Sequence, residues 1–483
     1  MSPTRALVAA AVAASLTLVG CGDVSENPVM TGVGPSPSLP PPSQSLFPTV
    51  RIAPARGWPA QKMPLAASGA AASPFARGLD HPRWLYVLPN GDVLVAETNG
   101  PERPDDARGL RGWFMKRVMK RAGARTVSAD RITLLRDTDG DGAADLRTVF
   151  LEDLKSPFGM VLVGGDFYVA NTDALVRFPY QPGQTKIGVA GTRVLELPAG
   201  TINHHWTKNV IASPDGARLY VTVGSNSNVA ENGMEAEQGR AAIWEVERAT
   251  GERRIFASGL RNPNGLAWQP DTQALWTVVN ERDELGNDLV PDYLTAVREG
   301  GFYGWPYSYF GQTPDDRVSP PRPDLVERAI RPDYALGSHV APLGLAWAER
   351  TTLPAPFQRG MYVALHGSWN RKPLSGYKVV FVRFENGAPV GEPIDLLTGF
   401  VDAKGDAQGR PVGGVFDATG ALLVADDVGN MIWRVSATAA ALPMPPPASA
   451  FTATGVLAPM KRPASAGADM MPGTAAATTA DAR

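Results

Sequence analysis

Two adjacent histidines, His204 and His205, stand in a chain of 483 residues that contains only five histidines. They come just before a β-hairpin pattern, in which Ser213-Pro-Asp-Gly216 predicts a turn and residues 218–223 predict a strand. Imidazole is the side chain that exchanges a proton near neutral pH. The pair is therefore a candidate general base, held at the mouth of a rigid β element.

Three further polar stretches follow predicted strands. Arg261 and Asn262 open an Arg-Asn-Pro-Asn-Gly run that can bind a planar anion through two hydrogen bonds, although the run is equally a good turn. Residues 280–284, Asn-Glu-Arg-Asp-Glu, offer carboxylates and carbonyls to a hard cation, or form a surface charge cluster. Residues 366–372, His-Gly-Ser-Trp-Asn-Arg-Lys, are unusually polar and aromatic for packing, so we interpret them as functional.

A stretch rich in aspartate and glycine, residues 137–145, places carboxylates at alternate positions, as a calcium-binding loop does. Thr148 stands where such a loop carries a glutamate, and no flanking helices are evident. The stretch is either a structural calcium site or a hairpin turn with solvated carboxylates. We assign no catalytic chemistry to it.

The chain repeats one pattern six times: a turn, then a short β-rich strand with small or polar residues at its end. Repeats of this size are typical of a β-propeller, whose ring of blades must close. The sequence therefore predicts an all-β fold, a six-bladed propeller over residues 51–437, rather than a pair of β-sandwiches. Insertions at 103–127 and 312–336 would be long rim loops. The six predicted strands are Val93–Glu97, Phe167–Asn171, Leu219–Val223, Leu275–Asn280, Met361–Leu365 and Leu422–Asp426.

Composition and the two ends predict an exported domain. The net charge of −2 gives no reason to expect nucleic acid as a partner. The single cysteine, Cys21, excludes an intrachain disulfide, a zinc–thiolate cluster and a Cys-x-x-Cys-His haem site. Residues 1–20 resemble a bacterial lipoprotein signal peptide ending at a lipidated Cys21; the alternative is a plain signal peptide. We expect residues 21–50 to be a Pro/Ser-rich tether and 438–483 a disordered tail. The domain would then face the periplasm, attached to a bacterial membrane only by its lipid.

The ordered motifs resemble the quinoprotein sugar dehydrogenases, which comprise soluble glucose dehydrogenases and aldose sugar dehydrogenases. The resemblance spans about residues 75–436. It is strongest toward the sorbosone dehydrogenase branch, and it implies a propeller that holds pyrroloquinoline quinone and calcium and oxidises a sugar or sugar aldehyde. The motifs that carry it are Asn203-His-His205, Arg261-Asn-Pro-Asn-Gly265, Asn280-Glu-Arg-Asp283, Glu299-Gly-Gly-Phe-Tyr-Gly-Trp-Pro306 and His366-Gly-Ser-Trp-Asn-Arg371.

The same resemblance implies roles for single residues. His205, by its distance from Pro214, takes the place of the general base, and His204 is left as a neighbour. Val412 stands where the family carries the second of two arginines. The metal ligands would be the main-chain carbonyls near Glu281 and Arg282, to which we add the carboxylate of Asp283. The implied and candidate cofactor-binding residues are Arg261, Asn262, Arg371, Lys372, Arg410, His366 and Lys208.

With no haem motif in the chain, electrons would leave to a separate acceptor, a quinone or a cytochrome. Two alternatives to a dehydrogenase remain. A six-bladed calcium lactonase would need several side-chain carboxylates or asparagines around the channel. A propeller that serves only as a binding scaffold would not need His205, Arg261 and His366 to converge on one rim.

Overall fold

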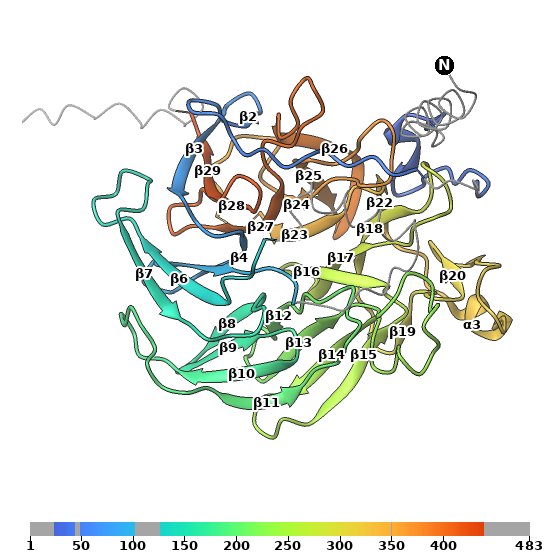
Figure 1. The fold of residues 1–483 in the computed structure, drawn as a ribbon, viewed down its shortest axis with the longest axis horizontal. Coiled ribbons are helices and arrows are strands. Elements are labelled where there is room, and N and C mark those ends of the chain that lie inside the picture. The colour runs from blue at the N-terminus through green and yellow to red at the C-terminus, as the bar shows by residue number, and fades with distance from the viewer. Residues whose placement is uncertain (1–23, 44–48, 102–125, 349, 439–483) are drawn as a thin grey trace, which may run out of the picture. The chain divides into compact units, whose positions relative to one another are not determined.

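The computed structural model describes residues 24–43, 49–101, 126–348 and 350–438. Within these residues the protein is nearly all β, with six sheets of four or five strands arranged around one axis (Figure 1). The predicted six-bladed propeller is confirmed. The predicted signal peptide with Cys21, most of the 103–127 insertion and the tail from 439 lie outside the described residues.

Each blade is a sheet of at least four strands, and its innermost strand lies nearest the axis. From the axis outward, blade 1 consists of β4 (Pro82–Val87), β5 (Val93–Glu97), β6 (Arg131–Arg136) and β7 (Leu146–Leu151), and blade 2 of β8 (Met160–Val163), β9 (Asp166–Ala170), β10 (Ala174–Pro179) and β11 (Thr192–Glu196). In the same order, blade 3 consists of β12 (Val210–Ala212), β13 (Arg218–Val223), β14 (Ala242–Glu247) and β15 (Arg253–Ser258), and blade 4 of β16 (Asn262–Gln269), β17 (Ala274–Asn280), β18 (Pro291–Ala296) and β22 (Tyr334–Ser338). Blade 5 consists of β23 (Pro342–Trp347), β24 (Gly360–Leu365), β25 (Lys378–Glu385) and β26 (Ala388–Thr398), and blade 6 of β27 (Pro411–Phe416), β28 (Leu422–Asp426), β29 (Met431–Ala437) and β3 (Ala70–Arg77).

The ring closes between the two ends of the chain. Strand β3, from the N-terminal part, is the outermost strand of blade 6 and pairs antiparallel with β29, from Arg77 opposite Met431 to Ala70 opposite Ala437. At the axis, β27 of blade 6 contacts β4 of blade 1. Closure by a borrowed strand leaves no blade without a neighbour, as a propeller requires.

Shorter elements decorate the ring. Three two-residue strands extend blades 3, 4 and 5 at their outer edges: β19 (Gly301–Phe302), β1 (Val33–Gly34) and β2 (Leu65–Ala66). The predicted rim insertion 312–336 contains the hairpin strand β21 (Thr313–Pro314), paired with β20 (Ser308–Tyr309), and helix α3 (Pro323–Arg328). Its last residues instead begin β22, a blade strand. The 3-10 turn η2 spans Val29–Gly32. None of the helices in the described ranges is long and apolar enough to cross a bilayer.

The core consists of six apolar clusters, one at each interface between neighbouring blades. Successive side chains of a strand point to opposite faces of its sheet. In β5, Leu94 and Ala96 therefore join the cluster between blades 1 and 2, while Val93 and Val95 join the one between blades 6 and 1. This placement explains why the repeated strands are apolar throughout rather than alternating with polar residues.

The six strands predicted from the repeat are all present, and each is the second strand of its blade. They are therefore not the strands that line the axis. In blade 3 the three-residue strand β12 lies inside β13. Innermost strands give a weaker sequence signal because several are short or interrupted, as β16 is by a register shift between Pro263 and Leu266.

The described part of the N-terminal segment, 24–43, lies against the ring, unlike the flexible tether expected over 21–50. Val33 and Gly34 pair with β22, and the backbone N–H of Ser43 donates to the carbonyl of Leu285 at 3.0 Å. Backbone hydrogen bonding of this kind orders a Pro-rich segment that has little core of its own.

Candidate active site

The predicted site residues lie on one rim of the propeller. Because neighbouring strands are antiparallel, the innermost strand of a blade begins at the edge where its second strand ends. Residues just before an innermost strand and just after a second strand therefore meet around the axis. At such positions are Lys208 before β12, Arg261 and Asn262 at the start of β16, Glu281 to Asp283 after β17, His366 after β24 and Arg410 before β27.

His205 is oriented by the segment that follows β13. Its Nδ1 lies 2.9 Å from both the carbonyl oxygen and the Oγ of Ser225. A carbonyl can only accept a hydrogen bond, so Nδ1 carries the proton and Nε2 is left with a free lone pair. Burial, reinforced by the charge of Arg261, holds the pKa of His205 well below 6.5. The imidazole is therefore neutral at pH 7, with Nε2 available as a base.

Arg261 ties the rim of blade 3 to that of blade 4. Its Nη1 donates to the carbonyl of Glu281 at 2.6 Å, and its Nη2 donates to Oδ1 of Asn228 at 2.9 Å and to Asp283 at 3.3 Å. Asp283 also accepts from Asn370 of blade 5 at 2.7 Å. The guanidinium beside His205 is thus held rigidly across three blades.

Asn262 approaches His205 closely because the residue between them is a glycine. A Cβ on Gly224 would lie 2.5 Å from Oδ1 of Asn262 and 2.5 Å from Cβ of His205, so no larger residue fits there. Oδ1 of Asn262 is buried without a hydrogen-bond partner among the described residues. We call His205, Ser225, Arg261, Asn262 and Asp283 the His205 group.

The stretch Glu281 to Asp283 is densely paired. Arg282 is fully buried, and its side chain bonds Glu281 at 3.1 Å and Asp315 at 3.0 Å. The cationic side chain therefore points into protein contacts and not toward a metal. Burial alone would raise the pKa of Asp283, but His339 and Arg261 hold it below its usual 3.8. Oε1 of Glu281 has no partner in the described structure.

Asp315 anchors this stretch to the rim insertion. It accepts from Arg282 and, through both carboxylate oxygens, from Arg317 at 2.9 and 2.8 Å. Burial opposes its ionisation, but the two arginines lower the pKa of Asp315 from 3.8 to about 2. The charged form is therefore favoured by folding.

Replacing Asp315 with asparagine should reduce the free energy of unfolding by about 2 kcal/mol at pH 7, since one pKa unit corresponds to about 1.4 kcal/mol. A lowered folded-state pKa contributes stability above about pH 4 and loses it as pH falls toward 2. The stability gap between Asp315→Asn and the parent, measured by denaturant unfolding, should therefore close between pH 4 and pH 2. A gap that stays constant over that range would contradict this assignment.

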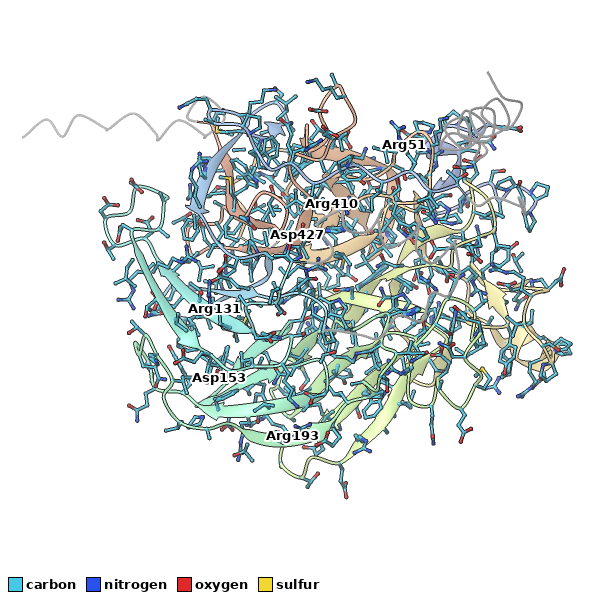
Figure 2. The ribbon with its side chains drawn as sticks, viewed as in Figure 1. Arg51, Arg131, Asp153, Arg193, Arg410 and Asp427 are labelled. Atoms are coloured by element: carbon cyan, nitrogen blue, oxygen red, sulfur yellow. The ribbon has the colours of Figure 1, made fainter. Side chains whose placement is uncertain are left out.

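A second set of polar residues surrounds a buried carboxylate, Asp427, directly after β28. Oδ2 of Asp427 accepts from Nη1 of Arg83 at 2.6 Å and lies 2.8 Å from Nε2 of His366. Nδ1 of His81 lies 3.1 Å from the carbonyl oxygen of Asp427. Arg410 stands close enough to repel Arg83 and His366, and it lies near Asp427 in Figure 2. We call these five residues the Asp427 group.

The Asp427 group carries excess positive charge. Burial lowers the pKa of His81 to about 4 and also lowers that of His366, so both rings are neutral at pH 7. Arg83 and Arg410 then stand against the single carboxylate of Asp427. Nε of Arg83, Nε of Arg410 and Oδ1 of Asp427 are buried without partners in the described structure. Two unsatisfied N–H donors in a cationic setting suit an anion.

Trp206 connects the two groups. It follows His205 in the chain, and the guanidinium carbon of Arg83 lies 5.8 Å from the centre of its ring. Phe158 lies on the same guanidinium at 6.0 Å. The loop that carries His205 therefore contacts blade 1, so both groups border one region of the rim.

Three predicted cofactor-binding residues are placed elsewhere. The guanidinium of Arg371 is 1% exposed and bonds the N-terminal segment at Ser25 and Asn27, as well as Asp288. Lys372 lies beside it, with its backbone bonded to Ser25 and to Asn287.

Lys208 is fully buried beneath the loop that carries His205. Its Nζ donates to the carbonyls of His205 and Trp206, both at 3.3 Å, and burial holds its pKa well below 10.5. The structure thus brings Arg261, Asn262, His366 and Arg410 to the rim site, whereas Lys208 supports the backbone under His205.

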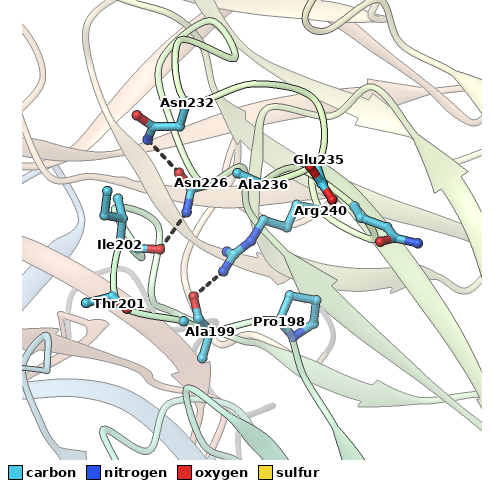
Figure 3. A pocket seen from close by; sticks show the side chains of 11 residues that line it. Pro198, Ala199, Thr201, Ile202, Asn226, Asn232, Glu235, Ala236 and Arg240 are labelled. Atoms are coloured by element: carbon cyan, nitrogen blue, oxygen red, sulfur yellow. Dashed lines mark hydrogen bonds between the residues drawn. The ribbon is translucent and has the colours of Figure 1, made fainter.

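A cavity of about 660 Å³ opens beside the loop that carries His205 (Figure 3). Its lining includes Thr201 and Ile202, which precede the histidine pair, and Asn226, which follows Ser225. Nδ2 of Asn226 donates to the carbonyl of Ile202 at 2.5 Å, so the two walls are joined. This volume lies in the range of small-molecule sites.

The Asp/Gly stretch 137–145 lies away from these residues, in the turn between β6 and β7. Asp137, Asp139 and Asp145 place carboxylate oxygens within 4.8 Å of one another, and no other such trio occurs in the described ranges. These carboxylates also accept backbone bonds within the turn, for example from Gly140 at 2.8 Å. Both alternatives for this stretch, calcium loop and hairpin turn, are compatible with that geometry.

Sequence reasoning assigned no functional role to Arg83, Asp427 or His81. Register within the repeat is the signal that identifies two of them. Asp427 follows the second strand of its blade, as Glu281 and His366 do, and His81 precedes a proline that opens an innermost strand, as Arg410 does. Aligning the six repeats by strand number rather than by turn motif would have found Asp427 and His81, whereas Arg83 is the second residue of its strand.

Comparison with known proteins places the chain in a family. A family model described as TrAA12-like matches residues 125–293 and 325–438. A pyrroloquinoline quinone-dependent pyranose dehydrogenase of Coprinopsis cinerea is 24% identical over 432 residues, which cover 76% of this chain and 54% of that one. An uncharacterized protein of Borreliella burgdorferi is 28% identical over 241 residues, covering 50% of this chain and 62% of its own. The chain thus spans less than two thirds of the length of these curated relatives.

Solved structures share the fold. A carbohydrate-active enzyme of family AA12 from Trichoderma reesei superposes with a TM-score of 0.62 at 19% identity, covering 82% of this chain and 100% of that one. The holo pyrroloquinoline quinone domain of the Coprinopsis cinerea pyranose dehydrogenase gives 0.60 at 21% identity, covering 80% and 100%. Because the family model matches more than half of the chain, the protein belongs to the TrAA12-like family.

Proposed function

We propose that the protein is a pyrroloquinoline quinone-dependent dehydrogenase that oxidises a pyranose, aldose or sugar aldehyde, with His205 as the general base. The observation that carries this proposal is the state of His205: Nδ1 donates to Ser225, and the ring is neutral with Nε2 free. A sugar hydroxyl that loses hydride from its carbon must also lose its proton, and a positioned neutral imidazole takes that proton at pH 7.

The residues present fit the quinone. Pyrroloquinoline quinone is a planar tricarboxylate, and the rim offers three guanidiniums together with buried N–H donors on Arg83 and Arg410 that lack partners. Asn262 adds an unpartnered amide oxygen beside His205. When bound, the quinone would supply the hydride acceptor for oxidation of the sugar.

Calcium fits this site less completely. Glu281 and Asp283 offer hard oxygen donors, but the carbonyl of Glu281 accepts from Arg261, and Asp283 accepts from Arg261 and Asn370. Among these oxygen donors, Oε1 of Glu281 is buried without a hydrogen-bond partner in the described structure. We keep calcium as a proposed cofactor, and adding or chelating it during reconstitution tests the assignment.

The chain's own residues divide the remaining work. Ser225 fixes the tautomer of His205, and burial, reinforced by the nearby charge of Arg261, keeps that imidazole neutral. Lys208 supports the carbonyls of the loop from below. The cavity beside Ile202 and Asn226 is the candidate entrance for the sugar. Relatives that act on sugars support this substrate class; the sorbosone branch stays a prediction within it.

Export and lipid attachment are part of the same proposal. The signal-like residues 1–20 and Cys21 support a periplasm-facing enzyme on a lipid anchor that passes electrons to a separate acceptor. Cys21→Ser should move the protein from the membrane fraction to the soluble fraction of bacteria expressing it. Identical fractionation of both forms would contradict lipid anchoring.

Reconstitution tests the function. Protein purified without cofactor should gain dye-reducing activity toward pyranoses, aldoses or sorbosone when pyrroloquinoline quinone and calcium are added together. The lactonase alternative predicts hydrolysis of lactones with calcium alone. A protein that retains no quinone after desalting, and reduces no dye with any of these sugars, would refute the dehydrogenase.

A further inference from the structure

The seam between blades 6 and 1 holds a buried charge arrangement that the proposed proton transfer does not use. Arg83 is the second residue of β4, the innermost strand of blade 1. Arg410 directly precedes β27, the neighbouring innermost strand in blade 6. Arg83 is 9% exposed and Arg410 is 6% exposed. Burying two guanidiniums is unfavourable unless acceptors pair with their donors. Of the two buried carboxylates nearby, Asp427 bonds Arg83, whereas Asp426 bonds the backbone N–H of Arg410 and two tryptophans and so leaves both guanidiniums unpaired with it.

The contacts show which donors are already used. Arg83 donates Nη1 to Asp427 at 2.6 Å, and Arg410 donates Nη2 to the carbonyl of Ala53 at 3.1 Å. The rings of Trp206 and Phe158 lie 5.8 and 6.0 Å from the Arg83 guanidinium, and Tyr377 lies 5.2 Å from that of Arg410. Nη2 of Arg410 also donates to the hydroxyl of Tyr377 at 3.4 Å, and no aromatic contact uses the Nε of either arginine.

What remains unsatisfied is specific. Nε of Arg83 and Nε of Arg410 have no partner in the described structure. Buried polar groups in native proteins nearly always have one, so two orphaned donors of the same charge point to a missing acceptor. Since Trp206 follows His205, this acceptor would lie beside the catalytic loop.

We propose that Arg83 is a cofactor-binding residue and that, together with Arg410, it binds a carboxylate group of the quinone at the seam between blades 6 and 1. Asp427 is the positioning residue that holds Arg83 and His366 there. The inference rests on the proposed function, because the carboxylate belongs to the quinone. It assigns a binding role to Arg83 of blade 1, which none of the sequence motifs includes.

Equilibrium binding of the quinone to cofactor-free protein, followed by tryptophan quenching, tests this without turnover. Arg83→Gln should weaken binding by about 10- to 100-fold, the range for one charge-assisted hydrogen bond. Arg83→Lys keeps the positive charge but loses the forked guanidinium, so its affinity for the quinone should lie between those of the parent and Arg83→Gln. The trimethyl ester of the quinone lacks the carboxylates, so Arg83→Gln should leave its affinity unchanged.

The matched control is Arg136→Gln. Arg136 also lies in blade 1 and pairs with a buried carboxylate, Asp92, at 2.6 Å, but at the opposite end of β6 from the site rim. Its affinity for the quinone should equal that of the parent. Equal affinities of Arg83→Gln and Arg136→Gln would overturn the assignment.

The outcomes separate this inference from the function itself. If the parent binds no quinone, the proposed function fails. If the parent binds it and Arg83→Gln binds equally well, only the role of Arg83 fails. Should Arg83→Gln not fold, as judged by its thermal midpoint, Arg83→Lys decides: affinity reduced severalfold supports the assignment, and unchanged affinity overturns it.

Discussion

His205→Ala is expected to lower turnover of the reconstituted enzyme by about 10²- to 10⁴-fold, the usual contribution of a positioned general base. Binding of the quinone should be retained, because the groups proposed to hold the quinone are the guanidiniums of the rim. The imidazole of His205 is instead bonded to Ser225. The measurement is kcat for dye reduction, alongside the affinity for the quinone by tryptophan quenching. KM for the sugar should change much less than kcat.

His204→Gln is the control for this substitution, because the adjacent histidine is not part of the His205 group. It should retain activity within a few-fold of the parent. If His205→Ala loses quinone binding as completely as it loses turnover, the residue is a structural ligand and not the base. Equal turnover of His205→Ala and the parent would remove His205 from the mechanism.

Asp427→Ala is expected to reduce the free energy of unfolding by about 3–5 kcal/mol, the cost of removing one partner of a buried charge pair. Asp427 is 2% exposed, and its loss leaves Arg83 without its carboxylate while Arg410 still repels it. Denaturant unfolding followed by circular dichroism measures the effect. Asp427→Asn, which still accepts a hydrogen bond, should be less destabilising.

An exposed ion pair provides the comparison. Glu152 and Lys186 lie 2.8 Å apart, but each side chain is 56% exposed, so water screens the pair. Glu152→Gln should leave the unfolding midpoint unchanged within error. A destabilisation by Asp427→Ala no larger than that of Glu152→Gln would mean that the Asp427 group does not hold the ring together.

Local sequence patterns were sufficient for the architecture, because each blade repeats the same physics. The pattern of a turn followed by an apolar strand predicted β5, β9, β13, β17, β24 and β28. Each of these strands contributes side chains to two interface clusters, one on either face of its blade. What the pattern could not resolve was the order of strands from the axis. Short innermost strands such as β12 carry too few residues for a periodicity.

The candidate site was only partly predictable, for a reason of distance along the chain. Arg261 and Glu281 come from neighbouring strands, so their proximity follows from a hairpin. Arg83 and Asp427 are 344 residues apart and meet only because the ring closes between blades 6 and 1. No local motif reports such a contact.

Arg371 shows the same limit from the other side. Its place after β24 made it a plausible cofactor ligand, but its donors bond Ser25 and Asn27 in a segment that the composition predicted to be a flexible tether. The charge of a residue is visible in the sequence, whereas the direction of its side chain depends on partners that only the fold supplies.

The central claim is that a sugar is oxidised at the rim of this propeller with His205 as the base. The most direct test mixes quinone-loaded protein with a pyranose under anaerobic conditions and follows the absorbance of the bound quinone. We predict a full, single-turnover loss of the oxidised-quinone absorbance in the parent, slowed at least 100-fold in His205→Ala. An oxidised-quinone spectrum that stays unchanged with every pyranose, aldose and sorbosone tried would contradict the account.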